Sequence, residues 1–391
     1  MKKITILSLH LGYGGIEKSV VSLANNLVHD YDVEILSVYR LYDKSPHNIN
    51  SNVKVKYLMD GDIALKTDKY KKSIRKLQFI KLFKLLFKDY KFNIFKLIKD
   101  TFLSVVNVIN KRKLVKDYIL DSNSDVIIST RDYLNKLLGK NGKKNQIKIG
   151  WEHNHHNGNK KYFKKICYSV VNLDYFVLVS KELYDDYSKS LKETSCKCVL
   201  IPNMIDIKNV KLSKINNHDL ITISRFSAEK GIFDLIDVVE LVKKDIPEIK
   251  LNLIGDGSLF DDVYNMIKDK NLENNVRLLG YRESEDVYNY LSNSSLYVMT
   301  SFTESFGIVL LEAFTFGVPA IAFDSANGAC ELINSNNGIL IANRDKKLMA
   351  DAIINYFSDK SLRDKLSKGT QKDLQKYSPE CIIVAWKKLF R

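Results

Sequence analysis

Short apolar runs alternate with amphipathic stretches along this chain. In the first half the strand-like runs are Ile4–Leu9, Val33–Val38, Val53–Tyr57, Val126–Ser129, Ile147–Trp151, Tyr175–Val179 and Val199–Ile201. In the second half they are Leu220–Ser224, Lys250–Ile254, Val276–Leu279, Leu296–Met299, Ala320–Phe323 and Gly338–Ile341. Short buried strands separated by helical patterns are typical of βα units around a parallel sheet. The pattern therefore predicts an α/β protein with two doubly wound domains.

The predicted boundary between the two domains lies at Ile201-Pro202-Asn203. A strand ends there in a turn signal, and the charge balance of the chain changes at the same place. We expect residues 1–203 to form an N-terminal domain and residues 204–378 to form a C-terminal domain. A chain of 391 residues is long enough for each domain to have its own core.

Residues 69–118 carry helical periodicity in place of strands. Four lysines recur there at spacings of 3, 4 and 3 residues, opposite a wide apolar side rich in Leu and Phe. A basic amphipathic helix of this kind suits an anionic membrane surface. A helix packed on the domain core with a solvated lysine face explains the pattern equally well, so both interpretations stay open. The four residues are Lys81, Lys84, Lys88 and Lys91.

The net charge of +15 comes entirely from the first half of the chain. Of 61 basic and 46 acidic residues, 37 and 20 lie in residues 1–205, which leaves 24 and 26 for the rest and gives +17 against −2. Such an asymmetry indicates an anionic partner for the first half: membrane headgroups, a phosphorylated acceptor or nucleic acid. A general bias toward Lys, Asn and Ile is the plainer explanation, but it should have made the second half basic as well.

The sequence favours a cytoplasmic protein that is at most peripherally attached to the inner face of the cell membrane. No apolar stretch approaches the ~18–20 residues needed to span a bilayer. The apolar run Ile4–His10 is short and has no small-residue cleavage site, so we interpret it as a buried strand and not as a signal peptide. The five cysteines form no CxxC pair, which favours reduced structural thiols, including those of Cys196-Lys197-Cys198.

Two loops that follow predicted strands contain residues suited to a diphosphate. Gly14 and Gly15 lie between the first strand and a helix, where backbone N–H groups can approach a phosphate at the positive helix end. The full GxGxxG spacing is missing, which disfavours NAD, and a plain tight turn would explain the glycines nearly as well. In the second domain, Arg225 and Lys230 flank a turn and can reach one diphosphate, although two ordinary surface cations would look the same.

The segment Thr303–Ala320 is the most informative part of the sequence. The strand before it leads into a predicted helix whose first turn, Ser305–Ile308, offers unpaired N–H groups to an anion or to sugar hydroxyls. Glu304 precedes this turn, and Glu312 lies eight residues on, about 12 Å along and roughly 80° around a helix. Two acceptors so placed can bracket the sugar and ribose hydroxyls of a nucleotide-sugar. Two solvated glutamates would not explain the apolar residues between them.

On these motifs the chain resembles the family-four retaining glycosyltransferases. The pattern Glu304-x7-Glu312, with Ser-Phe-Gly after the first Glu and Gly-Val-Pro downstream, is similar to that of the family. The likeness covers nearly the whole second domain, and one departure, Met204 where the family usually has Gly, puts only the linker conformation in doubt. Further matching stretches are Gly14-Gly15-Ile16-Glu17, Ile201-Pro202-Asn203, Arg225, Glu229-Lys230-Gly231, Gly255-Asp256-Gly257 and Val276–Tyr281.

The resemblance implies the GT-B fold, in which two Rossmann-like domains face each other across a cleft and the last helix, 379–391, crosses back to the first domain. By the same resemblance Glu312 would bind the donor ribose, Glu304 the transferred sugar, and backbone near Tyr281 the base. Catalytic roles would fall to His153, Glu304, Arg225 and Lys230, the last two on the diphosphate. The implied donor-binding residues are Gly14, Gly15, Arg225, Lys230, Tyr281, Glu304, Ser305, Phe306, Gly307, Ile308 and Glu312.

The expected activity is transfer of a sugar from a nucleotide diphosphate sugar, with a UDP-sugar favoured, to a glycan or lipid-linked acceptor in surface polysaccharide or glycoconjugate synthesis. The resemblance suggests retention of configuration by same-face attack, with the leaving phosphate taking the acceptor proton. We expect no metal and no other cofactor, because Arg225, Lys230 and a helix N-terminus would stabilise the leaving group.

Other interpretations were weighed against this one. Glu152 with His153, His155 and His156 invites a metal site, but side chains at a strand end point in different directions. Asp60-Gly61-Asp62 matches a metal-binding DxD string, although its position predicts a turn. A nucleotide-sugar epimerase of the same fold is the alternative enzyme. A basic nucleic-acid-binding or membrane-binding protein without catalysis is the non-enzymatic alternative, and the sequence contains no recognised nucleic-acid module.

Overall fold

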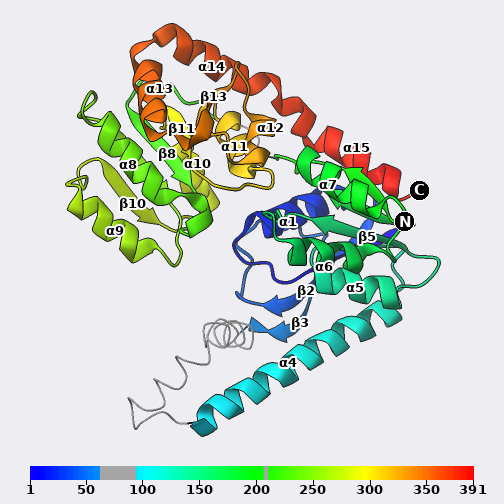
Figure 1. Ribbon diagram of the computed structural model, residues 1–391. Coiled ribbons are helices and arrows are strands. Elements are labelled where there is room, and N and C mark those ends of the chain that lie inside the picture. Colours follow the sequence, from blue (N-terminus) through cyan, green and yellow to red (C-terminus); the bar gives the residue numbers. More distant parts are fainter. Residues whose placement is uncertain (62–93, 207–209) are drawn as a thin grey trace.

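The computed structural model describes residues 1–61, 94–206 and 210–391. These residues form two α/β domains (Figure 1), each built on a parallel sheet. The seven-stranded sheet has the order β3-β2-β1-β4-β5-β6-β7, and the six-stranded sheet has the order β10-β9-β8-β11-β12-β13. In each sheet the chain starts at an inner strand, builds out to one edge and then returns to build the other side. This doubly wound order confirms the predicted fold class.

The first sheet lies between helices that connect its strands. Its strands are β1 (Lys3–Ser8), β2 (Asp32–Arg40), β3 (Lys54–Asp60), β4 (Val126–Ser129), β5 (Ile147–Glu152), β6 (Tyr175–Leu178) and β7 (Lys197–Leu200). Its helices are α1 (Gly15–Leu27), α4 (Ile94–Asp121), α5 (Asp132–Asn141), α6 (Lys160–Val170) and α7 (Lys181–Leu191). In Figure 1 the long helix α4 extends away from the rest of the domain.

Among the described residues, the second domain has shorter strands and more helices than the first. Its strands are β8 (Asp219–Ile223), β9 (Lys250–Ile254), β10 (Val276–Gly280), β11 (Leu296–Met299), β12 (Ala320–Phe323) and β13 (Gly338–Ile341). Its α-helices are α8 (Ile232–Val242), α9 (Phe260–Asp269), α10 (Ser284–Ser292), α11 (Ile308–Thr315), α12 (Asn327–Leu332), α13 (Lys346–Ser358) and α14 (Lys360–Lys372). Three 3₁₀ turns are η1 (Ala228–Lys230), η2 (Ala342–Arg344) and η3 (Leu374–Tyr377).

The burial of each strand follows from its place in the sheet. β1 pairs with β2 on one side and β4 on the other, and Ile4–Ser8 are all buried. A strand covered on both faces is apolar almost throughout, which is why the sequence shows a continuous run there and no alternation. The edge strands β3 and β7 contain exposed residues and end the sheet.

The last helix, α15 (Pro379–Leu389), follows the second domain in sequence but packs on the first, against α1. Trp386 is fully buried and meets Trp151 edge-on, with ring centroids 4.9 Å apart. Lys2 Nζ donates to the carbonyl of Phe390 at 2.6 Å, so the two ends of the chain lie together (Figure 1). The domain boundary at residues 203 and 204 stays a prediction.

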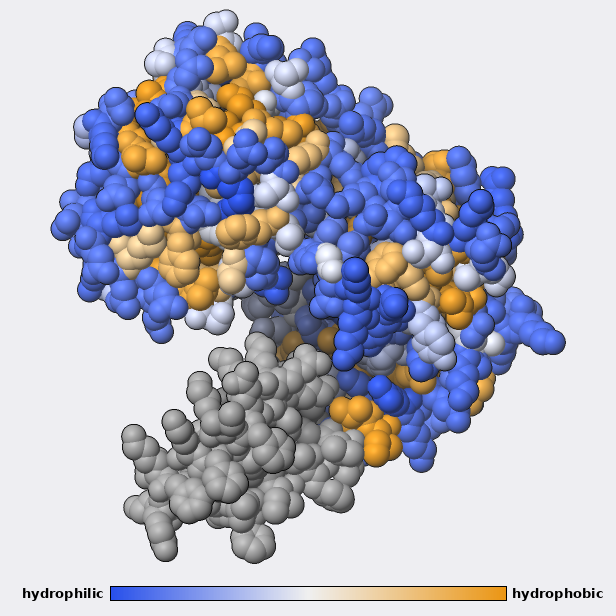
Figure 2. Space-filling model, viewed as in Figure 1, coloured by the Kyte–Doolittle hydropathy of each residue, from blue (hydrophilic) through white to orange (hydrophobic). Residues whose placement is uncertain are grey.

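The predicted lysine stripe at Lys81, Lys84, Lys88 and Lys91 lies outside the described residues. No helix in the described ranges combines the length and apolar character needed to cross a membrane. Figure 2 shows a mostly hydrophilic face on both domains, with apolar areas between the polar ones. The five cysteines all lie in described parts of the chain, and none forms a disulfide.

Candidate functional site

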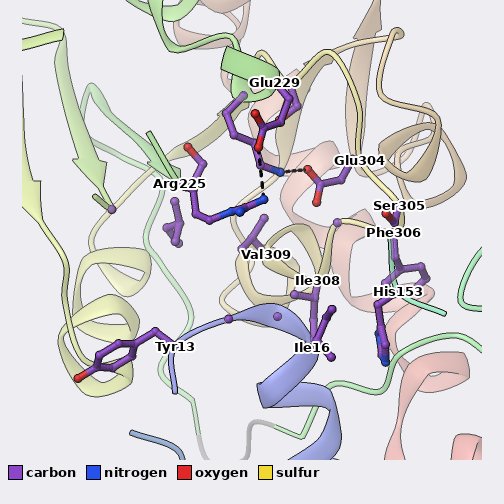
Figure 3. Close-up of a pocket in the computed structure, with 18 of the residues that line it drawn as sticks. Tyr13, Ile16, His153, Arg225, Glu229, Glu304, Ser305, Phe306, Ile308 and Val309 are labelled. Atoms are coloured by element: carbon purple, nitrogen blue, oxygen red, sulfur yellow. Dashed lines mark hydrogen bonds and ion pairs between the residues drawn. The ribbon is translucent and has the colours of Figure 1, made fainter. Parts of the chain in front are cut away.

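A cleft of about 1050 Å³ lies between the two domains. Its walls are loops that follow strands: β1 and β5 in the first domain, and β8, β9, β10 and β11 in the second. Open parallel sheets place ligands at these carboxyl ends. Figure 3 shows Arg225, Glu229 and Glu304 on one side of the cleft, with Tyr13, Ile16 and His153 on the other. The predicted donor-binding residues that line it are Gly14, Gly15, Arg225, Lys230, Tyr281, Glu304, Ser305, Phe306, Gly307 and Ile308.

The glycine turn brings the start of helix α1 to the cleft. Gly14 is the N-cap of α1, and a side chain there would collide with the Glu17 carboxylate. The uncapped N–H groups of this first turn carry partial positive charge and can bind an anion. The sequence prediction that Gly14 and Gly15 lie at a ligand-accessible helix start therefore agrees with where these residues lie.

The two predicted phosphate-binding cations differ in their surroundings. The Arg225 side chain is 77% exposed, with Nη2 at 3.3 Å from Glu229 Oε1. The Lys230 side chain is only 15% exposed, and its Nζ lies 2.5 Å from Glu304 Oε2. Gly231 follows Lys230 with φ +62°, and a β-carbon there would run into the Thr300 carbonyl. Lys230 is therefore held in place next to Glu304, whereas Arg225 has room to swing toward a ligand.

The predicted helical first turn at Ser305–Ile308 is wrong, because α11 begins only at Ile308. Gly307 is the N-cap and has φ +83°, a left-handed conformation that ends the preceding loop. Glu304 consequently lies in the loop, and the distance and angle expected for two glutamates on one helix do not apply. What remains of the prediction is a helix N-terminus that faces the cleft, with Glu304 beside it.

Glu312 lies in α11 and does not line the cleft. It is 5% exposed, and its Oε1 accepts a short hydrogen bond from Lys18 Nζ of helix α1 in the other domain. Lys18 also contacts the Tyr288 hydroxyl at 3.4 Å. Burial lowers the pKa of Lys18, but the charges and hydrogen bonds of Glu312 and Tyr288 together outweigh it, so the pKa stands well above its ordinary value. Lys18 therefore stays charged and ties the two domains together through Glu312.

The first-domain wall contains acidic, basic and imidazole groups in close contact. Arg131 Nη2 donates to Glu17 Oε1 at 3.1 Å. Burial raises the pKa of Glu17, although the Arg131 charge opposes this. Burial, with a smaller contribution from the Arg131 charge, lowers the pKa of His153 to about 3, so this imidazole is neutral at physiological pH. The sequence analysis did not predict Arg131 as a cleft residue, nor its ion pair with Glu17. Arg131 lies two residues after a predicted strand, and the other cleft residues also follow strands, so its position could have indicated it.

Four polar atoms at the cleft are buried and make no hydrogen bond to any part of the protein that the structure describes. They belong to four residues that line the cleft: His153 Nε2, Arg131 Nε, Asn203 Oδ1 and Ser224 Oγ. Folded proteins rarely leave buried polar groups unsatisfied. Four such atoms from both domains around one cleft indicate a polar ligand that bonds to both walls.

His155 and His156 lie at the edge of the cleft with stacked rings 4.6 Å apart. With Asp186 they form the one group in the described ranges whose possible ligand atoms all lie within 4.8 Å of one another. His156 Nδ1 accepts the Gly158 N–H at 3.1 Å, so the ring proton sits on Nε2, 2.7 Å from Asp186 Oδ2. A metal on this Nε2 would put a proton on Nδ1 opposite the Gly158 N–H. We therefore interpret the cluster as a hydrogen-bonded network.

Tyrosines from both domains meet at the cleft. The ring of Tyr281 lies 4.0 Å from that of Tyr13, and the Tyr13 hydroxyl donates to Glu283 Oε1 at 3.0 Å. Tyr42 meets Tyr13 edge-on at 5.0 Å. The region predicted to contact a nucleotide base thus has aromatic faces supplied by both domains.

Comparison with known proteins identifies the second domain. Residues 204–373 match the sequence profile of the family described as "Glycosyl transferases group 1". The match covers most of the second domain and less than half of the chain.

Two similar proteins are named as glycosyltransferases of polymers of glycerol phosphate and of ribitol phosphate. The Poly(glycerol-phosphate) alpha-glucosyltransferase of Bacillus subtilis is 30% identical over 60% of this chain and 36% of its own length. The Poly(ribitol-phosphate) alpha-N-acetylglucosaminyltransferase of Staphylococcus aureus is 37% identical over 49% of this chain and 38% of its own length. The chain thus spans less than two-fifths of the length of either relative.

Solved structures show that this chain has the GT-B fold. Staphylococcus aureus TarM superposes with a TM-score of 0.77 over 100% of both chains, at 21% identity. That structure contains UDP and alpha-GlcNAc-glycerol. HepE of Anabaena, in complex with UDP and glucose, gives a TM-score of 0.71 over 99% of both chains at 17% identity. The predicted GT-B architecture is confirmed, and it extends to the first domain, which the family profile does not cover.

Proposed function

We propose that this protein is a retaining glycosyltransferase that moves a sugar from a nucleotide diphosphate sugar, preferably a UDP-sugar, to a glycan or lipid-linked acceptor of the cell surface. The observation that carries the proposal is the cleft with Lys230 and Glu304 paired on one wall and unsatisfied polar atoms on both. The match of residues 204–373 to the group 1 family profile and the named activities of the relatives support it. The UDP bound in TarM and in HepE favours uracil as the base.

In the proposed reaction, Arg225 and Lys230 neutralise the diphosphate as its bond to the sugar C1 breaks. The positive ends of α1 and α11 add to this stabilisation. The cations and the helix ends are in position before the reaction begins, so no reorganisation is needed as the charge develops. The acceptor oxygen attacks C1 from the same face, and its proton passes to an oxygen of the leaving diphosphate. Glu304 would accept hydrogen bonds from sugar hydroxyls, and neutral His153 would offer Nε2 to the transferred sugar.

Glu312 does not line the cleft in this structure, and the family resemblance alone assigns it to the ribose, which it would bind through the carboxylate oxygen that Lys18 does not occupy. Backbone near Tyr281 would contact the base. The first domain would supply the acceptor surface. We propose no metal, because the two cations and two helix N-termini can take its place on the diphosphate. An epimerase or a non-catalytic nucleic-acid-binding protein is not favoured, since the named relatives are transferases.

A thermal-shift screen of UDP-, GDP- and ADP-sugars tests the proposal. A ligand at about 100 times its dissociation constant should add roughly 2.7 kcal/mol to stability. We expect UDP-sugars to raise the melting temperature and sugar transfer to continue in excess EDTA. No shift with any nucleotide-sugar would contradict the proposal, and activity that EDTA abolishes and Mg²⁺ or Mn²⁺ restores would contradict the metal-free mechanism.

We further propose that the basic first half brings the protein to an anionic membrane that carries the acceptor. The support is the +17 charge of residues 1–205. Each lysine near an anionic leaflet is worth about 1 kcal/mol. Sedimentation with anionic vesicles at low salt should carry the wild type down, and reversing the lysine stripe (Lys81, Lys84, Lys88 and Lys91) to Glu should abolish this. A wild type that stays in the supernatant would favour a soluble acceptor.

A further inference from the structure

Arg344 lies behind the second-domain wall of the cleft and does not line it. It ends the turn η2 after β13, and its φ is +53°, next to Asn343 at +56°. Residues with a β-carbon seldom adopt this left-handed conformation, and two in succession are rarer. Other interactions must therefore hold this turn in place, and the Arg344 side chain supplies four hydrogen bonds for this.

The guanidinium of Arg344 is 18% exposed and uses both terminal nitrogens twice. Nη1 donates to the Ser301 carbonyl at 3.0 Å and to the Ser325 hydroxyl at 2.8 Å. Nη2 donates to Asp234 Oδ2 at 2.5 Å and to the Thr300 carbonyl at 2.9 Å. The charged plane also lies 3.5 Å from the centre of the Phe302 ring. Only a planar fork with several donors can satisfy this set, so lysine is not an equivalent residue.

Apart from Ser325, which follows β12, these partners lie next to Lys230 or in the loop that leads to Glu304. Asp234 lies in the first turn of α8, directly after Lys230-Gly231, and Thr300 and Ser301 lie in the loop that leads to Glu304. The two loops also touch directly, because the Thr300 hydroxyl donates to the Lys230 carbonyl at 3.3 Å. On the cleft side the same loops meet through the Lys230–Glu304 ion pair. Arg344 therefore holds the two loops together on the side away from the cleft, and the Lys230–Glu304 ion pair joins them on the cleft side.

We infer that Arg344 is a positioning residue for diphosphate binding: it fixes the distance between Lys230 and Glu304 without touching the donor. The inference rests on the proposed function, because it assigns Lys230 to the diphosphate. Replacing Arg344 should therefore weaken the binding of ligands that have a diphosphate and leave the binding of ligands without one unchanged. A residue that only stabilised the domain would affect both kinds of ligand alike.

The experiment compares UDP with uridine by calorimetry, or the corresponding diphosphate and nucleoside if the screen above selects another base. Arg344→Gly removes the fork and relieves the left-handed backbone, while Arg344→Lys keeps the charge. We expect UDP to bind about tenfold more weakly to both variants, as for the loss of one charge-assisted hydrogen bond, and uridine to bind as to the wild type. Turnover with the donor sugar should fall in parallel with UDP binding.

Lys346→Met is the matched control, because Lys346 contacts the same Asp234 at 3.7 Å, and Asp237 at 2.8 Å. It makes no counterpart of the Arg344 hydrogen bonds to Thr300 and Ser301 in the loop before Glu304, so UDP affinity should be unchanged. In a Lys230→Met background, Arg344→Gly should cause no further loss of UDP affinity, since it acts through Lys230.

Additive losses in that double variant, or equal effects on uridine and UDP, would overturn the inference alone. A wild type that binds neither ligand of any base would overturn the proposed function and the inference with it. Unchanged UDP affinity in Arg344→Gly, with the wild type binding normally, would show that the turn is held for stability only.

Discussion

At the scale of single residues, Glu152 is an acid buried beside the cleft at the end of β5. One of its oxygens, Oε1, accepts the backbone N–H groups of His153 and Asn154 at 3.0 and 2.8 Å. Burial nevertheless dominates and raises the pKa of Glu152 to about 7, from an ordinary value of 4.5. The fold therefore keeps a carboxyl group partly protonated next to His153, which burial keeps neutral.

This gives a prediction for stability against pH. Between pH 4.5 and about 7 the folded protein binds the Glu152 proton and the unfolded chain does not, so the free energy of unfolding falls as the pH rises. Above pH 7 the effect is constant. Glu152→Gln keeps the hydrogen-bond acceptor without the charge, so its stability relative to the wild type should grow across this window by on the order of 3 kcal/mol.

Urea denaturation of both proteins at pH 5, 6, 7 and 8 provides the measurement. His153 acts in the opposite direction: its folded pKa of about 3 lies below the ordinary 6.5, so it adds stability as the pH rises from 3 to 6.5. His153 is present in both proteins, and its contribution cancels in the difference. Parallel stability curves for the two proteins would show that the Glu152 carboxyl titrates normally.

At the scale of elements, the start of α11 is set by Gly307 and not by a capping side chain. Its φ of +83° ends the loop and turns the first N–H groups of α11 toward the cleft. A β-carbon there would lie 3.3 Å from Leu310 Cδ1 and 3.5 Å from Glu304 Cγ. The same backbone conformation thus positions both the helix end and Glu304.

Gly307→Ala should lose about 1–2 kcal/mol of stability, because a β-carbon is unfavourable at positive φ. Donor binding should also weaken, because relieving the strained backbone at residue 307 would move the adjoining loop that carries Glu304. Gly158→Ala is the control: Gly158 has φ +69° in open space and does not line the cleft. We expect calorimetry with UDP to find a loss of affinity only in Gly307→Ala. Equal UDP affinities in the two variants would mean that the loop absorbs the change.

At the scale of the whole molecule, the two domains are joined by side chains around the cleft as well as by the chain. Lys18 pairs with Glu312 on one side, and the Glu331 carboxylate accepts the first N–H groups of α7, from Lys181 at 2.9 Å and Glu182 at 3.1 Å, on another. Donor binding and contact between the domains are thus linked through Glu312. We propose that Glu312 binds the donor ribose, and its bond to Lys18 joins the two domains.

A charge exchange separates these two roles of Glu312. Lys18→Met leaves a buried carboxylate without its cation and should destabilise the protein by about 3–5 kcal/mol, while Glu312→Gln should weaken UDP binding by about 1.5–3 kcal/mol. The double variant Lys18→Glu with Glu312→Lys should recover much of the stability but not the UDP affinity. Denaturation and calorimetry on the same samples give both quantities. Recovery of both in the double variant would make Glu312 an interdomain tie only.

The sequence by itself determined the fold class, the order of elements and most of the cleft. Buried strands of a parallel sheet are continuous apolar runs, and ligands gather at their carboxyl ends, so Arg225, Lys230 and Glu304 could be located by counting from predicted strands. Such patterns depend only on residues that are close together in the sequence, so they can be recognised without the structure. The start of α11 was misplaced because helical periodicity does not reveal that Gly307 adopts a left-handed conformation.

Only the tertiary structure decided which side chains meet. Lys18 and Glu312 are 294 residues apart, and Lys230 and Arg344 belong to loops after β8 and β13. No spacing rule connects such positions, because their proximity depends on how the domains face each other and on the order of strands in the sheet. The burial that holds His153 neutral and raises the pKa of Glu152 has the same origin. It comes from packing by distant segments, which removes water from groups that the sequence alone shows only as polar.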